Sequence, residues 1–257
     1  MESELDLKLK GKRVVVTCAS AGVGLACAQR FLDEGADVFG LSRNPPVLVN
    51  TVDRKVGIHW KSCDITKESS IQQTLQSIGE AEVLVFVPIR ERIAGLSEVQ
   101  IDEMRTSIED CLIPFAMFTQ TLLPGMLARN YGRVICLLGA STLAPLWDHV
   151  LANISRVSVA SLASGAAREF AAHGITFNNI ILGVFDTPGL RERWSISAKN
   201  KGIDIKKYEA SRKGAIPVNS LGDPQQCAAL AAFLGSPLSS YLTGQSLRID
   251  GGLQHCL

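Results

Sequence analysis

The chain has 257 residues, of which 46% are hydrophobic and 20% are charged, and its 26 Lys and Arg residues almost balance its 25 Asp and Glu residues. This composition is typical of a globular protein with a substantial core, and the near-neutral charge argues against a broad surface for nucleic acid or anionic membranes. The seven cysteines form no CxxC pair, which argues against zinc and thioredoxin-like sites. The charged stretch 1–12 and the absence of a long apolar run predict a cytoplasmic protein without a signal peptide or membrane span.

Strand and helix patterns alternate along the chain. Short apolar runs rich in β-branched residues predict strands at 13–18, 36–41, 57–63, 82–87, 132–138, 176–182 and 246–249. Helical spacing predicts helices at 25–34, 67–78, about 108–128, about 150–172 and 224–234. We expect one α/β domain over residues 1–257, a Rossmann-type doubly wound parallel sheet with helices on both faces and a lid-like insertion at 188–217.

A glycine-rich turn lies between the first predicted strand and helix. Residues 17–24 read T-C-A-S-A-G-V-G. Free N–H groups at the start of the helix, together with Gly22 and Gly24, would let the backbone approach a pyrophosphate closely. The alternative is that these glycines only allow the helix and the strand to pack tightly.

Further motifs fall at regular points along the chain. Asp64 follows the third predicted strand, Thr187 follows the sixth, and residues 241–252 read Y-L-T-G-Q-S-L-R-I-D-G-G. Together with the turn, these motifs resemble the short-chain dehydrogenase/reductase family over the whole chain. The resemblance implies NAD(P) binding by Ser20, Gly22, Gly24, Arg43, Asp64 and Thr187.

Two of these residues have other possible roles. Arg43 follows the second predicted strand, where a guanidinium suits the 2′-phosphate of NADP, but it is also compatible with an ordinary surface arginine. Asp64 either lies on the adenine side of the cofactor or caps a turn at the end of its strand. If a cofactor binds, NADP is therefore favoured over NAD.

The sequence departs from the family at the residues that carry its chemistry. The family's Asn, Ser, Tyr and Lys align with Cys111, Gly139, Ala152 and Arg156. Alanine has no proton to donate, and arginine stays cationic at neutral pH. Cys18 replaces the first glycine of the turn, where we expect it to crowd the backbone. The family's Asn-Asn-Ala-Gly loop is replaced by F-V-P-I at 86–89, so that loop should differ in shape.

These losses favour an inactive subunit, with no catalytic residue and no metal, that stabilises or regulates an oligomeric dehydrogenase. The nearly uncharged helices at 111–123 and 150–167 would associate with like copies or with an active paralogue. The basic stretch 188–217 matches the family's substrate lid, and it would either meet an acidic or coenzyme A-linked hydroxyacyl or ketoacyl substrate or form a mobile, solvated flap.

The alternative function is an NADP-dependent oxidoreductase, or a non-redox enzyme derived from one, whose catalytic groups have moved. Asp148, His149 and Ser141 lie near the expected cleft, although Asp148 is also a plausible N-cap of the next helix. Trp147 suits a hydrophobic staple or an interface anchor. The charged triplet 90–92 would either bind an anion or form a solvated loop.

Overall fold

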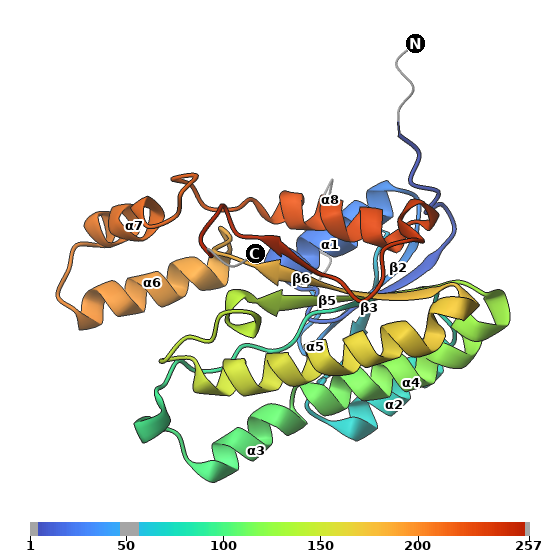
Figure 1. Ribbon diagram of the computed structural model, residues 1–257, viewed down its shortest axis with the longest axis horizontal. Coiled ribbons are helices and arrows are strands. Elements are labelled where there is room, and N and C mark those ends of the chain that lie inside the picture. The colour runs from blue at the N-terminus through green and yellow to red at the C-terminus, as the bar shows by residue number, and fades with distance from the viewer. Residues whose placement is uncertain (1–4, 47–56, 255–257) are drawn as a thin grey trace.

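The computed structural model describes residues 5–46 and 57–254. Its centre is a parallel sheet of seven strands in the order β3-β2-β1-β4-β5-β6-β7 (Figure 1). The strands are β1 (Arg13–Val16), β2 (Asp37–Ser42), β3 (His59–Ser62), β4 (Val83–Phe86), β5 (Gly132–Gly139), β6 (Ile175–Leu182) and β7 (Ser246–Ile249). The predicted doubly wound fold is confirmed. The order reverses between β1 and β4, which is where ligands bind in open α/β sheets.

Helices cover both faces of the sheet (Figure 1). On one face lie α1 (Gly22–Asp33) and α8 (Pro224–Gly235); on the other lie α2 (Glu68–Ile78), α4 (Leu112–Arg129) and α5 (Val150–Phe170). The remaining helices are α3 (Ile101–Glu109), beside α5, and the pair α6 (Pro188–Asn200) and α7 (Ile205–Gly214), which extends away from the sheet. Each face has its own apolar core, so the sheet is buried on both sides.

Helices α4 and α5 pack on the same face of the sheet as α2 and contribute to the apolar core of that face. The stretches Ile101–Arg129 and Val150–His173 are long and apolar enough to span a membrane by composition. The sequence was expected to contain no stretch long and apolar enough to span a membrane, and by length and composition that expectation was wrong. Both helices lie along the sheet and bury Phe115, Phe118 and Val159 against it, which accounts for their apolar inner faces.

Two segments differ from the predicted elements. Helix α3 was not predicted, because its apolar Ile101 and Ile108 lie on the surface rather than in a buried stripe. The lid segment, for which a mobile flap was one interpretation, forms two helices, and their N-termini are capped by Thr187 and Asp204. Cys256 lies outside the described residues.

Candidate active site

The turn between β1 and α1 contains a cysteine at the position that the sequence motif matches to the family's first glycine. Cys18 adopts a left-handed backbone with φ 48°, a region that glycine enters freely and that costs other residues about 1–2 kcal/mol. A Cβ on Gly24 would lie 2.6 Å from the Cys18 carbonyl oxygen, so that position requires glycine. A Cβ on Gly22 would lie 3.2 Å from Cγ2 of Thr187, so the turn faces the start of the lid.

The N-terminus of α1 is open to an anion. No described side chain caps it at Ala21, and no acidic residue stands in its first turn. Ser20 precedes it in the same turn. Because uncapped N–H groups and the helix dipole favour a negative ligand, the turn fits the pyrophosphate of a dinucleotide.

Arg43 and Asp64 follow neighbouring strands at one edge of this site. Arg43 is exposed directly after β2, and its carbonyl accepts a hydrogen bond from Ser62 Oγ at 3.1 Å. Asp64 Oδ1 accepts from the backbone N of Thr66 at 3.1 Å and from its Oγ1 at 2.8 Å, so Asp64 does cap a turn. Burial acts to raise the pKa of Asp64, but the Thr66 hydrogen bonds and the charges of Lys67 and Arg43 lower it overall. The Arg43 charge therefore lies close to the Asp64 carboxylate.

The four positions that the sequence motifs match to the family's catalytic residues hold a cysteine, a glycine, an alanine and an arginine. Cys111 is buried where α3 meets α4, and burial raises the pKa of its thiol to about 12. Gly139 ends β5, and Ala152 is buried in the first turn of α5. Arg156 is the remaining polar group of the four.

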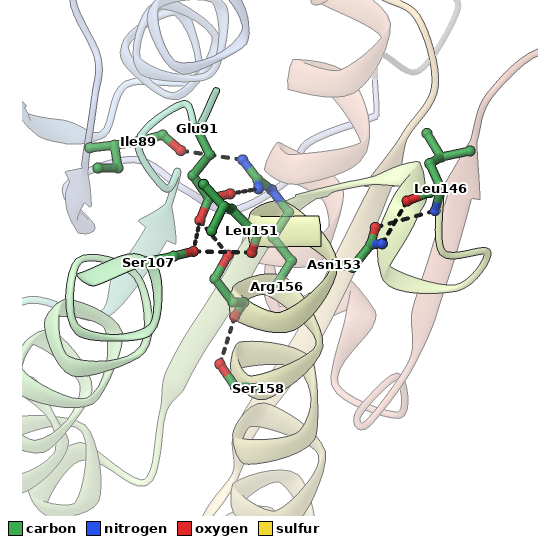
Figure 2. Close-up of polar contacts among 9 residues, drawn as sticks. Ile89, Glu91, Ser107, Leu146, Leu151, Asn153, Arg156 and Ser158 are labelled. Carbon is green, nitrogen blue, oxygen red and sulfur yellow. Dashed lines mark hydrogen bonds and ion pairs between the residues drawn. The ribbon is translucent and has the colours of Figure 1, made fainter. Parts of the chain in front are cut away.

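A buried network surrounds Arg156 (Figure 2). Its guanidinium forms an ion pair with Glu91 and donates to the Ile89 carbonyl oxygen at 3.2 Å. Glu91 Oε1 also accepts hydrogen bonds from Ser155 Oγ at 2.7 Å and from Ser107 Oγ. Only 8% of the Glu91 side chain and 12% of the Arg156 side chain are exposed.

Glu91 does not belong to a solvated loop, which was one interpretation of residues 90–92, because its side chain is buried in this network. Three hydrogen-bond donors, Ser107, Ser155 and Arg156, hold its carboxylate inside the protein, and two of them come from α5. The carboxylate neutralises the arginine that stands in place of the family's lysine. Sequence reasoning missed this pair because its partners lie 65 residues apart.

Ser141 lies beside Gly139, the position that the sequence motifs match to the family's serine. A Cβ on Gly139 would lie 3.9 Å from Ser141 Oγ and 3.8 Å from Arg156 Cδ. Ser141 is 5% exposed, and its hydroxyl hydrogen-bonds to no other described residue. A hydroxyl is thus present near the place of the family's serine side chain, but it comes from a different backbone position.

Asp148 and His149 form a dyad where α5 begins. Nδ1 of His149 lies 2.7 Å from Oδ1 of Asp148. The prediction of Asp148 as N-cap is wrong, because His149 occupies that position and the Asp148 carboxylate hydrogen-bonds to the His149 ring instead. Counting along α5, His149, Ala152 and Arg156 stand at i, i+3 and i+7, which places them on one face of the helix.

Trp147, next to the dyad, does not form the hydrophobic staple that the sequence suggested. Its side chain is 83% exposed, so it does not pack against the first turn of α5. Instead, the side-chain amide of Asn153 holds the preceding loop by donating to the Leu146 carbonyl oxygen at 2.7 Å. The loop that carries the dyad is therefore fixed to α5 by hydrogen bonds.

Known proteins resemble this chain along almost its whole length. The family model described as enoyl-(acyl carrier protein) reductase matches residues 18–254. The 3-oxoacyl-(acyl-carrier-protein) reductase FabG of Vibrio harveyi is 28% identical, with 96% of this chain and 99% of that protein covered. The 2,3-dihydroxy-2,3-dihydro-p-cumate dehydrogenase of Pseudomonas putida is 27% identical, with 96% of this chain and 95% of that protein covered.

Solved structures agree with these relatives. L-sorbose reductase from Gluconobacter frateurii, complexed with NADPH and L-sorbose, has a TM-score of 0.88 and 25% identity, covering 98% of this chain and 100% of that one. Aldohexose dehydrogenase from Thermoplasma acidophilum has a TM-score of 0.85 and 26% identity, covering 97% of this chain and 96% of that one.

The expectation of an inactive subunit is contradicted by these comparisons, because the relatives that match nearly the full chain are named as reductases and dehydrogenases. That expectation was drawn from the four replaced side chains, together with Cys18 and the changed loop at 86–89. The Glu91–Arg156 pair and the Ser141 hydroxyl occupy that region instead. From the matching family model, the fold and the relatives, this chain belongs to the short-chain dehydrogenase/reductase family.

Proposed function

We propose that this chain is an NADPH-dependent oxidoreductase that interconverts a carbonyl compound and an alcohol, with its acid–base group moved to His149. The observation that carries the proposal is the contact between Asp148 and His149 at the start of α5. Because the dyad stands one helical turn before Ala152, it lies on the side of α5 where the family's tyrosine would be. An imidazole exchanges protons readily near neutral pH.

When bound, the nicotinamide supplies the hydride for reduction and accepts it for oxidation. His149 donates a proton to the carbonyl oxygen during reduction and removes it from the hydroxyl during oxidation. Asp148 holds the Nδ1 side of the ring and stabilises the imidazolium, which leaves Nε2 for the substrate. The Ser141 hydroxyl, near the end of β5, orients the substrate oxygen.

The preference for NADPH rests on Arg43. Its exposed guanidinium follows β2, and its charge lies near Asp64 and Cys18 around the glycine-rich turn. A guanidinium matches a phosphate group in charge and geometry. We assign Ser20, Gly22, Gly24 and Thr187 to the pyrophosphate and nicotinamide side, and Asp64 to the adenine side.

Association and location are part of the same proposal. The outer faces of α4 and α5 expose Ile113, Val157 and Leu162, so these helices would bind a second copy of the chain. All six described cysteines are free thiols, as is usual in a reducing cytoplasm.

The test is NADPH oxidation by the purified protein with a panel of ketones and aldehydes. His149→Asn and Asp148→Asn should lower kcat by about 100-fold or more, since general acid catalysis contributes on this scale. Asp102→Asn serves as the matched control, because Asp102 is an exposed carboxylate in a surface ion pair. NADPH binding, measured by calorimetry, should be unchanged in all three variants.

Two results would contradict the proposal. One is full activity in His149→Asn, which would place the acid–base group elsewhere. The other is substrate conversion that depends on His149 but neither consumes nor requires a nicotinamide, which would indicate a non-redox enzyme.

A further inference from the structure

Arg90 lies across the start of the lid. A Cβ on Gly189, in the first turn of α6, would overlap the Arg90 guanidinium, so the absence of a side chain there makes room for the arginine. Arg90 is otherwise exposed, and it follows β4 by four residues. The guanidinium is therefore set against the lid at the carboxyl ends of the strands, where open α/β sheets bind their ligands.

A second arginine lies on the same side of the lid. Arg193 stands four residues after Gly189 on α6, so the two positions share one helix face. Arg193 is half-buried. Burial lowers the pKa of Arg193, and the positive charges of Arg90 and Arg156 lower it further, which means that these cations are close to one another.

These two arginines lack a counter-ion among the residues that the structure describes. Within residues 5–46 and 57–254, neither Arg90 nor Arg193 forms an ion pair, whereas Arg156 is neutralised by Glu91 and Arg191 by Asp186. Two neighbouring guanidinium groups without an anion repel each other. An exposed and a half-buried guanidinium that lie close together are suited to binding an oxyanion.

The arginines are also adjacent to the proposed cofactor site. Thr187 lies against the glycine-rich turn at Gly22, and it stands only two residues before Gly189. A group held by Arg90 would thus be near the end of the cleft assigned to the nicotinamide.

We propose that Arg90 and Arg193 form a subsite for an oxyanion, carboxylate or phosphate, carried by the substrate. The identification of the ligand as a substrate rests on the proposed function, whereas the anion site itself does not depend on turnover. The substrate class is then a carbonyl compound, or the corresponding alcohol, with an acidic group near the reacting carbon. Neutral sugars and simple ketones would be poor substrates.

The test measures anion binding to the full-length protein without cofactor. Malonate and inorganic phosphate are titrated by calorimetry against the wild type, Arg90→Met and Arg193→Met, with Arg191→Met as the control on the same helix. We expect binding to weaken about tenfold or more in the first two variants, since a charge-assisted hydrogen bond is lost, and to be unchanged in the control. The anion that binds more tightly shows whether the subsite prefers a carboxylate or a phosphate group.

Thermal unfolding gives a second readout that does not need turnover. Removing one of two repelling charges should raise the Tm of Arg90→Met and Arg193→Met in anion-free buffer while abolishing the stabilisation by malonate or phosphate. Equal anion binding in the wild type and both variants would overturn the proposal. The same holds if an oxo acid and its methyl ester are reduced with the same kcat/KM.

The outcomes separate the two proposals. Anion binding that depends on Arg90 and Arg193, without any turnover, would leave the subsite standing and remove the oxidoreductase. Turnover that depends on His149, without anion binding at the arginines, would support the oxidoreductase and remove the subsite.

Discussion

Replacing Glu91 by glutamine should destabilise the protein strongly. The substitution keeps the size of the side chain but leaves the buried Arg156 charge without its counter-ion. Removal of one member of a buried pair costs on the order of 3–5 kcal/mol, whereas an exposed pair contributes about 1 kcal/mol or less. The glutamine oxygen still accepts hydrogen bonds from Ser107 and Ser155, so the lower figure is expected. For a chain of this size, about 3 kcal/mol corresponds to a Tm lower by roughly 6–12 °C.

The assay is urea unfolding followed by circular dichroism, with Asp102→Asn as the control. Asp102 forms its ion pair with Arg105 at the surface, where the two side chains are 89% and 69% exposed. Adding Arg156→Met to Glu91→Gln removes the unpaired charge, so the double variant should be more stable than Glu91→Gln alone. A loss in Glu91→Gln no larger than in Asp102→Asn, or a double variant with strictly additive losses, would refute the reasoning.

Three other variants test separate parts of the structure. Arg43→Ala should lower the preference for NADPH over NADH by about tenfold or more, measured by calorimetry, with Lys61→Ala as the control; an unchanged ratio would show that Arg43 is an ordinary surface residue. We expect light scattering to give the mass of the proposed dimer for the wild type and for Val218→Glu, which is exposed away from α4 and α5, and the mass of a monomer for Val157→Glu on α5. Burial raises the pKa of the Cys111 thiol from 9.0 to about 12, so the unfolded chain releases that proton first and stability falls as pH rises from about 9 towards 12. Cys111→Ala should reduce this slope by one proton in urea titrations at several pH values, and an identical slope would contradict the assigned burial.

The fold could be predicted because its signals are local. Runs such as 132–138 and 176–182 are long, apolar and β-branched, and each is followed or preceded by a helix of clear spacing. Helix α3 escaped prediction because it is short and its apolar residues are exposed; its remaining signals were Gln100 and Glu103, which form a capping box, and the acidic first turn. Boundaries differed by a few residues at other elements, as they do where helices and strands fray.

The site was predicted less completely because its contacts are long-range. The glycine-rich turn and Thr187 could be placed from motifs, although nothing in the sequence showed that Gly22 contacts Thr187. For the charged triplet 90–92 the sequence left open an anion site or a solvated loop. In the structure Glu91 is buried against Arg156, and Arg90 lies on Gly189. Sequence spacing gives no information on such pairings, since they depend on how β4, α5 and the lid meet in space.

Hydride transfer by this chain is measured with NADPH that carries deuterium at both C4 positions and a carbonyl substrate, and the deuterium is detected in the alcohol product by mass spectrometry. We expect one deuterium per product molecule with the wild type and with Asp102→Asn, and a loss of about 100-fold or more in rate with His149→Asn. No deuterium transfer by the wild type to any compound of an acidic and neutral carbonyl panel, or an undiminished rate in His149→Asn, would contradict the account.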